Sequence, residues 1–316
     1  MALMVGNHWL EPILPSPIPR SLATAASALF ESSAKFPSEW VAMPSTLSTC
    51  AAINDTHHSL AIENVYVDTA LLVSACRDPA TSSQDDLGVI HLRAQHQLQS
   101  HAQGAGTQAW AWFFEAKTLS LIHRALFAGA GPEDAGLACD DHLVPGQLRS
   151  QSERNVKVGR HMAPSWESVD RMLQRLSGVY SASPDSVARL LGVAAYHHRL
   201  AFVHPFDDGN GRLARLLSHL QLSRLGLNAH LWSLSRGLAR RRDEYWARLR
   251  NADQPRRGDL DGRGQLTQAG LVEFMAFFLE VCQEEIQASQ TVASTLSTED
   301  DVAAVLGKYQ PATFCG

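Results

Sequence analysis

The sequence predicts a mainly α-helical fold with one small β-hairpin. Apolar residues recur at helical spacing in several long segments, and Pro or Gly residues stand at the ends of these segments. Only 143–164, which carries VKVG among Gly, Pro and polar residues, has the pattern of a loop with a short hairpin. With 316 residues, of which 45% are hydrophobic and 19% charged, the chain can form a large packed core.

The N-terminal part of the chain predicts three helices. Residues 1–50 are rich in Pro, Ser and Ala, and within them only 21–33 has a helical pattern. In 59–76 the apolar residues follow helical spacing, which predicts one continuous amphipathic helix. The segment 104–129 predicts a further long helix, stopped by Gly129 and a second glycine two positions later.

Two helices are predicted before the polar stretch that follows Val203. A helix over 164–178 comes first. The next helix has Ser183 as N-cap and Pro184 at its first helical position, and Pro205 ends it because proline lacks an N–H group and restricts the residue before it.

The C-terminal part continues the helical pattern. A helix over about 210–225 stops at Gly226, and 273–286 forms a late helix. We find no internal repeat. The segment 259–270 begins like a calcium-binding loop, but Arg263 and Gly270 stand where oxygen ligands are needed, so it is interpreted as an ordinary loop.

Composition excludes several classes of protein. A net charge of -5 argues against non-specific binding to nucleic acid, which needs a positive surface. The five cysteines are scattered and form no C-x-x-C pair, so neither a disulfide framework nor a zinc site is indicated, and a reducing, cytoplasmic location fits best. The N-terminus lacks the basic start of a signal peptide, and no apolar run is long enough to span a membrane.

The stretch HPFDDGNGRLAR, residues 204–215, joins two of the predicted helices and carries the pattern of a phosphate site. The N-terminus of a helix has unpaired N–H groups and partial positive charge, which attract phosphate. Gly209 and Gly211 allow the backbone to approach a ligand closely. Arg212 and Arg215 lie three positions apart on one helix face, where each can bind phosphate oxygens.

Two further side chains of this stretch suit nucleotide chemistry. Asp208 supplies a carboxylate, and Mg²⁺ prefers one or two carboxylates together with phosphate oxygens. His204, with an ordinary pKa near ~6.5, suits the removal of a proton from an attacking hydroxyl. The alternative is a turn between helices with a capping aspartate, a buried histidine and solvated arginines. The coincidence of all these residues within one short stretch favours the functional interpretation.

The stretch resembles the signature of the Fic family, HPFx[D/E]GNGRxxR, with every specified position filled. PGQLRS upstream is similar to the family's G-x-[YLF]-R segment, and VKVG to MAP lies where the family has a flap that positions the target. His197 and the downstream RDEYWARL also match. The resemblance covers roughly 100–280 and implies a Fic fold, a helical bundle with a small β-hairpin flap. It divides the chain into an N-terminal region (1–95), a catalytic core (96–285) and a tail (286–316).

The resemblance implies an adenylyltransferase that moves AMP from ATP to a Tyr, Thr or Ser hydroxyl of a protein, with Mg²⁺ or Mn²⁺ as cofactor. Whether the target is another protein or this chain itself is left open. Phe206 would anchor the loop, and Asp207 has no role in this scheme. By this resemblance His204 is the base and Asp208 is the metal ligand. Asn210 and the amides near Gly209 and Gly211 form the anion hole. Arg212 binds oxygens of the α- and β-phosphates, and Arg215 binds the γ-phosphate.

A second element, SLAIEN at 59–64, resembles the family's inhibitory pattern [S/T]xxxE[G/N]. By resemblance Glu63 pairs with Arg215, and Ser59 caps or braces the helix. A carboxylate on this arginine would displace the γ-phosphate by competition and repulsion. The alternative is a solvated glutamate on an amphipathic helix.

Other functions stay open at this point. Removal of AMP from a modified protein uses the same loop, with Glu63 directing water, and a catalytically silent regulatory or toxin–antitoxin module is a further alternative. The glycines of GNG count against a kinase.

Tyr245 and Trp246 lie either near the adenine or in the core, and His197 with His198 more readily braces the core than binds zinc. The tail resembles a winged helix cut short before its recognition helix, which argues against DNA binding; a homo-oligomer is left open.

Overall fold

The computed structural model describes residues 4–5, 8–42, 46–78, 86–103, 110–128, 143–150, 157–158, 161–296 and 302–309. In these residues the mainly α fold with a small β-hairpin flap is confirmed. The elements are β1 (Met4–Val5), β2 (His8–Trp9), α1 (Arg20–Ser33), α2 (Ser38–Ala42), α3 (Thr46–Ile62), α4 (Thr69–Arg77), α5 (Leu87–Gln103), η1 (Trp110–Phe114), α6 (Ala116–Leu126), β3 (Lys157–Val158), β4 (His161–Met162), α7 (Trp166–Tyr180), α8 (Ser186–Val203), α9 (Asn210–Arg224), η2 (Ala229–Leu231), α10 (Leu234–Arg240), α11 (Arg242–Ala252), α12 (Gln268–Ala293) and α13 (Val302–Tyr309).

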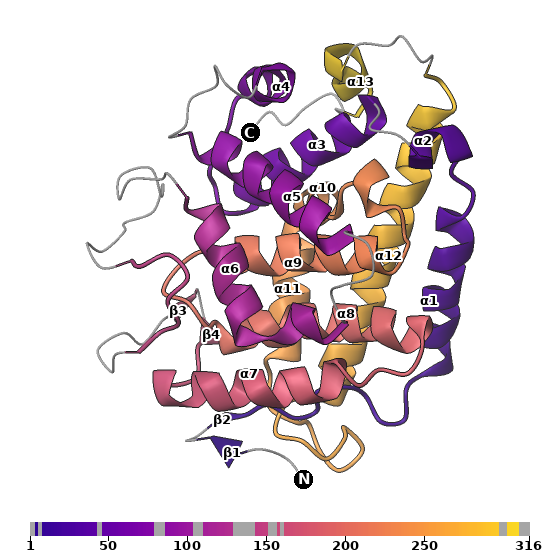
Figure 1. Ribbon diagram of the computed structural model, residues 1–316. Coiled ribbons are helices and arrows are strands. Elements are labelled where there is room, and N and C mark those ends of the chain that lie inside the picture. The colour runs from indigo at the N-terminus through magenta and orange to yellow at the C-terminus, as the bar shows by residue number, and fades with distance from the viewer. Residues whose placement is uncertain are drawn as a thin grey trace.

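The helices α8 and α9 form the centre of the bundle (Figure 1). α8 packs against α7, α9 and α12, and α1 lies along the outer side of α12. α9 packs against α5 and α6, while α3 lies against α5 and α10. The turn between α8 and α9 is therefore held by helices from both halves of the chain.

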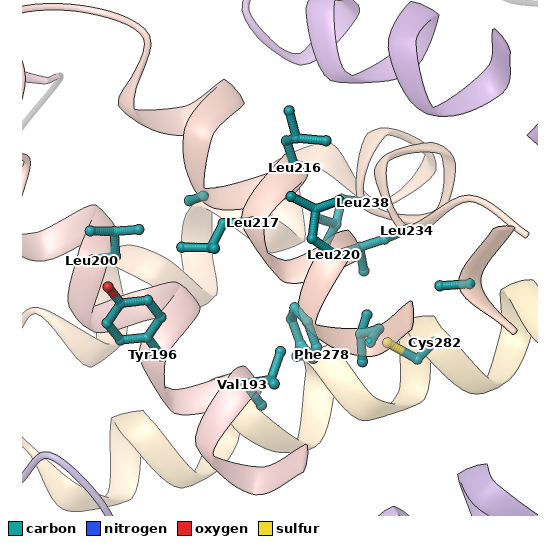
Figure 2. Packing of buried hydrophobic residues seen from close by; sticks show 14 of the residues in the cluster. Val193, Tyr196, Leu200, Leu216, Leu217, Leu220, Leu234, Leu238, Phe278 and Cys282 are labelled. Atoms are coloured by element: carbon teal, nitrogen blue, oxygen red, sulfur yellow. The ribbon is translucent and has the colours of Figure 1, made fainter. Parts of the chain in front are cut away.

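The core lies between α8, α9, α10 and α12 (Figure 2). α8 is apolar on most of its circumference, which is typical of a helix enclosed on all sides. Side chains from four helices meet there and are almost completely buried: Val193, Tyr196, Leu200, Leu216, Leu217, Leu220, Leu234, Leu238, Phe278 and Cys282.

Residues 10–13, which we call the N-terminal strap, are fixed by side chains from the middle of the chain. The guanidinium of Arg199, itself completely buried, donates from Nε and Nη2 to the carbonyl oxygen of Pro12 at 2.9 and 2.7 Å. The hydroxyl of Tyr180 donates to the carbonyl oxygen of Ile13 at 2.7 Å. Arg175 forms an ion pair with Glu11 at 2.8 Å, so this strap closes one end of the bundle.

The prediction of one helix over 59–76 is wrong. α3 ends at Ile62, and α4 begins only at Thr69. Asn64 has a φ of 62°, a left-handed conformation that ends a helix, and the Asp68 carboxylate caps α4 by accepting from the N–H of Ala70 at 2.8 Å. The apolar spacing continues across the end of α3 and the start of α4, so it did not reveal the break between them.

Three other expectations differ from the structure. The predicted helix 104–129 is divided into η1 and α6, and its glycine stop lies outside the described residues. Asp185, not Ser183, caps α8, because its carboxylate accepts from the N–H of Ala188 at 2.8 Å and Ser186 is the first helical residue. No helix was predicted over the segments that form α2, α5, α10 and α11 or over residues 46–58 of α3, and the second hairpin, β1–β2, was not predicted. The hairpin β3–β4, the helices α7 and α9 and the late helix α12 are confirmed, with α12 longer than predicted.

Among the described residues, none of the helices combines the length and the apolar character needed to cross a membrane.

Candidate active site

The turn between α8 and α9 begins at His204. This residue has a φ of 49° and a ψ of 63°, and its N–H donates to the carbonyl oxygen of Leu200 at 3.0 Å. The left-handed conformation ends α8 directly before Pro205, as predicted. The backbone then turns into α9, whose first residue is Asn210.

Arg149 fixes this end of α8. Its buried guanidinium donates to three carbonyl oxygens, those of His204 at 2.7 Å, Pro164 at 2.9 Å and Val203 at 3.1 Å. Its own N–H donates to the carbonyl oxygen of Pro205 at 2.9 Å. The last carbonyl groups of a helix lack partners within the helix, so Arg149 satisfies them and orients the backbone of His204.

We expect the substitution Arg149→Met to lower the free energy of unfolding by about 3 kcal/mol or more, because it leaves three buried carbonyl groups without a donor. Urea denaturation measures this change. Arg248→Met is the control, since Arg248 forms ion pairs with Glu244 and Glu273 on the surface. An equal loss of stability in both variants would contradict the role of Arg149.

Aromatic side chains pack against the turn. His123 of α6 stacks on Phe206, with ring centroids 4.0 Å apart and planes at 14°. Its Nδ1 accepts from the N–H of Gly146 at 2.8 Å, so Nε2 carries the proton and donates to the carbonyl oxygen of Asp208 at 2.9 Å. Burial lowers the pKa of His123 to about 4, which keeps the ring neutral. Phe127 stacks against the other side of the same histidine, with 4.7 Å between ring centroids.

The amide of Asn210 closes the loop on itself. Its Oδ1 accepts from the N–H of Phe206 at 3.0 Å, and its Nδ2 donates to the carbonyl oxygen of Phe206 at 2.8 Å. Gly209 has a φ of 74°, and a Cβ there would come within 2.6 Å of the ring of Phe127. The side chain of Asn210 therefore holds the loop. Of the groups expected to bind an anion, Asn210 thus uses the polar atoms of its side chain within the loop.

Arg212 and Asp208 form an ion pair at this turn. Arg212 is buried, donates from Nη2 to Asp208 Oδ2 at 3.1 Å and lies 4.5 Å above the ring of Phe127. The carboxylate of Asp208 is 29% exposed, and burial raises its pKa although Arg212 opposes this shift. The partly exposed carboxylate of Asp208 can therefore contact a group outside the turn.

Arg215 is 1% exposed and is bound by the end of α3. Its Nε donates to Ser59 Oγ at 2.9 Å, and its Nη2 donates to the carbonyl oxygen of Ser59 at 2.8 Å and to Glu63 Oε1 at 2.7 Å. The expected pairing of Glu63 with Arg215 is therefore present in the structure. Ser59 braces it through both its hydroxyl and its carbonyl oxygen.

Glu63 is placed by the way α3 ends. The N–H of Val65 donates to the carbonyl oxygen of Leu60 at 3.1 Å, and that of Asn64 to Ala61 at 3.0 Å, which is the Schellman arrangement. Asn64 takes the left-handed position that follows the cap, so Glu63 is the C-cap residue. This geometry gives a physical reason for Asn or Gly after the glutamate in the pattern SLAIEN.

The carboxylate of Glu63 lies directly against the start of α9. A Cβ on Gly211 would come within 2.2 Å of Glu63 Oε1, so only glycine leaves room for it. Burial by itself raises the pKa of Glu63, but the charge of Arg215, its hydrogen bond to Glu63 and the charge of Arg212 outweigh burial, and the net pKa lies below its ordinary value. The group is an anion held at the N-terminus of a helix.

The imidazole of His204 is neutral. Burial lowers its pKa to about 3, and the nearby His161 and Arg149 contribute in the same direction. A neutral ring at ordinary pH has one nitrogen free to accept a proton, which is the state that a general base needs.

The neighbouring histidines have structural roles. His197 is hydrogen-bonded to Ser218 Oγ and to the hydroxyl of Tyr245, both at 2.8 Å, so it braces the core as predicted. His198 is bound to Asp253 at 3.1 Å. Tyr245 is itself buried, and Trp246 lies beneath the guanidinium of Arg242 at 4.2 Å.

The structure thus brings every predicted site residue to one place, although Ser59 and Glu63 come from a helix far away in sequence. Sequence reasoning missed Arg149, His123 and Phe127, which hold the turn, and His161 with Asp253, which lie beside it. Arg149 stands in the segment PGQLRS, and its signal was the match of that segment. His161 lies in the segment from VKVG to MAP, but no residue of that segment was singled out. His123, Phe127 and Asp253 belong to no short motif, and only the fold brings them to the turn.

Comparison with known proteins agrees with this geometry. A family model described as Fic/DOC family matches residues 113–222. A protein of Nematostella vectensis named protein adenylyltransferase Fic is 32% identical over 106 residues, which are 33% of this chain and 22% of that protein. A protein of the same name from Culex quinquefasciatus is 30% identical over 115 residues, which are 36% of this chain and 20% of that protein. The chain spans about a fifth of the length of these curated relatives.

Solved structures share the fold over most of the chain. A Fic family protein from Desulfovibrio desulfuricans G20 has a TM-score of 0.66 at 18% identity, covering 93% of this chain and 86% of its own. Fic-1 (aa134–508) from C. elegans has a TM-score of 0.58 at 19% identity, covering 88% of this chain and 73% of its own. The helical fold extends well beyond the matched residues.

Proposed function

The chain carries a Fic/DOC family domain over residues 113–222, and on this basis we propose that it transfers AMP from ATP to a Tyr, Thr or Ser hydroxyl of a protein. The names of the curated relatives support transfer of AMP, with ATP as the substrate. The proposed reaction uses His204, Asp208, Arg212 and Arg215 together with the first turn of α9.

One observation carries this proposal: the carboxylate of Glu63 lies where an anionic group of a nucleotide would lie. It is bound to Arg215 at 2.7 Å and lies against the backbone of Gly211 at the N-terminus of α9. Two buried arginines and a helix N-terminus around one position favour negative charge there. A triphosphate supplies such charge and has oxygens enough for both arginines.

The chemistry follows from the placement of His204. Its neutral imidazole accepts the proton of the target hydroxyl while the hydroxyl oxygen bonds to the α-phosphorus of ATP. The bond from the α-phosphorus to the bridging oxygen breaks, and pyrophosphate leaves with that electron pair. Arg212, Arg215 and the N–H groups of α9 hold the phosphates, because this transfer depends on positioning and neutralisation of charge.

The residues at the turn fit a divalent cation that binds together with nucleotide. Asp208 offers one partly exposed carboxylate, and Mg²⁺ typically takes one or two carboxylates plus phosphate oxygens. Within the described ranges, no group of three or more His, Cys, Asp or Glu is gathered in a way that holds a metal by itself. Asp208 would hold Mg²⁺ or Mn²⁺, which neutralises phosphate charge when bound.

Incubation with α-labelled ATP, Mg²⁺ and a cell lysate is expected to label proteins, and EDTA is expected to abolish the label. Asp208→Asn removes the proposed ligand charge and should raise the Mg²⁺ concentration for half-maximal labelling by at least about tenfold. Asp207→Asn is the matched control, because Asp207 has no assigned role in the proposed reaction. The proposal fails if neither wild type nor a Glu63 variant labels any protein; a silent module then explains the fold.

We further propose that Glu63 inhibits this activity. Arg215 cannot bind the carboxylate and the γ-phosphate through the same Nη2 at once, and the two anions repel each other. The ion pair is supported by Ser59 of α3, which accepts two hydrogen bonds from Arg215, and by the turn at the end of α3 that places Glu63. Release of Glu63 from Arg215 would open the phosphate site.

A further inference from the structure

The flap hairpin β3–β4 is fastened to the catalytic turn through one histidine. His161 of β4 is 12% exposed, and its two ring nitrogens face different acceptors. Its Nδ1 lies 3.2 Å from Asp253 Oδ2, and its Nε2 lies 3.0 Å from the carbonyl oxygen of Phe202. Phe202 precedes His204 by two residues, so this contact joins the flap to the end of α8.

The two acceptors define the charge of His161. A carbonyl oxygen and a carboxylate only accept hydrogen bonds, so both ring nitrogens must carry protons for both bonds to exist. The ring is then an imidazolium. Burial by itself lowers the pKa of His161, but the hydrogen bond and the charge of Asp253 outweigh it and the net pKa is raised.

Asp253 is prepared as the partner of this cation. Its other oxygen, Oδ1, lies 3.1 Å from Nε2 of His198. His198 accepts at Nδ1 from Nη1 of Arg199 at 2.8 Å, so its Nε2 carries the proton and the ring is neutral. Asp253 thus accepts from two histidines and carries one negative charge, and its pKa lies below its ordinary value although burial opposes this.

We propose that His161 is a positioning residue of this site, an imidazolium that fastens β4 of the flap to the end of α8 through Asp253 and the carbonyl oxygen of Phe202. This inference rests on the proposed function in one respect, since the flap is assigned to target positioning. Four charged or titratable groups surround His161. Asp253 follows α11, His198 lies in α8, His204 is the residue after α8, and Arg149 precedes the flap.

The same cation has a second effect on the reaction. His161 and Arg149 both disfavour a positive charge on His204, so they keep the base neutral. When His161 loses one proton, only one of its ring nitrogens still donates a hydrogen bond. The lone pair of the other nitrogen then faces an oxygen that can only accept, and that contact is lost. Because the folded pKa is raised, the fastening is complete below the ordinary value of 6.5 and is lost as pH rises through the higher folded value.

The titration of His161 in the full chain tests this directly. NMR of ¹³C-labelled histidine is expected to place its midpoint above 6.5, and Asp253→Asn is expected to lower that midpoint by about 1 to 3 pH units. Hydrogen exchange of the amides in 157–162 should become about tenfold or more faster in His161→Gln, and His230→Gln, the same change in η2, should leave it unchanged. A midpoint at or below 6.5, or equal exchange in both variants, overturns the proposal.

Activity adds a readout that a merely structural role would not change. In the Glu63→Gly background, AMP incorporation from labelled ATP into a fixed lysate is expected to be about tenfold lower with His161→Gln at pH 6.5. The ratio to the parent should approach one as pH rises through the midpoint that NMR gives for His161, because the parent then also loses the second proton. A pH-independent ratio overturns the proposal. If no version transfers AMP, the proposed function fails, and titration and exchange still decide on the fastening.

Discussion

We expect the substitution Glu63→Gly to raise the rate of AMP transfer by about 10- to 100-fold. The variant removes an ion pair of 2.7 Å between Glu63 and a guanidinium that is otherwise buried. Such a charge-assisted hydrogen bond contributes about 1.5–3 kcal/mol, and this energy no longer opposes binding of the γ-phosphate. Arg215 keeps both hydrogen bonds to Ser59, so its guanidinium stays in place to receive the phosphate.

The measurement is incorporation of label from α-labelled ATP into lysate proteins at saturating Mg²⁺. Glu63→Gln keeps the size and one acceptor of the side chain but removes its charge, so its rate should lie between wild type and Glu63→Gly. Glu244→Gln is the matched control, because Glu244 forms an ion pair of equal length with Arg241 on α11, away from the turn. An unchanged or lower rate for Glu63→Gly would reject inhibition by this residue.

The second large effect concerns the base. His204→Ala, introduced together with Glu63→Gly, is expected to reduce AMP transfer by about 10²- to 10⁴-fold, the usual contribution of a general base. The affinity for ATP should change little, because the proposed phosphate ligands are Arg212, Arg215 and the start of α9. The backbone of His204 keeps its bonds to Leu200 and Arg149 in the variant.

Rapid-mixing kinetics of AMP transfer and equilibrium binding of ATP separate these two quantities. Burial holds the pKa of His204 at about 3, so the parent should lose no activity through protonation of this ring between pH 8 and about 5. Loss of ATP binding in proportion to the loss of rate would mean that His204 holds the nucleotide. Retention of most of the rate would mean that another group takes the proton.

Local sequence was sufficient for the turn itself. Pro205 marked the end of α8, the glycines marked the entry into α9, and the polar side chains between them carried the chemistry. The helix pattern failed where a single residue changed the direction of the chain. Asn64 interrupts an otherwise continuous apolar spacing, and in sequence it differs little from any polar residue on a helix.

Contacts between distant segments could not be predicted in the same way. His161 and Asp253 are separated by about half of the predicted catalytic core in sequence. His161 lies in the segment from VKVG to MAP, but nothing in that segment points to Asp253 as its partner. The pairing of Glu63 with Arg215 was predicted because the sequence resembled a known family. Spacing and periodicity alone gave no reason to bring α3 to the start of α9.

The N-terminal strap has a consequence for the order in which the molecule is assembled during synthesis. Its carbonyl groups at Pro12 and Ile13 are bound by Arg199 and Tyr180, side chains that leave the ribosome more than 160 residues later. Contacts of such long range form only after the intervening chain is available. The strap is made well before these partners and therefore reaches its final position late, and until then the ribosome-bound chain exposes the end of the bundle that the strap closes.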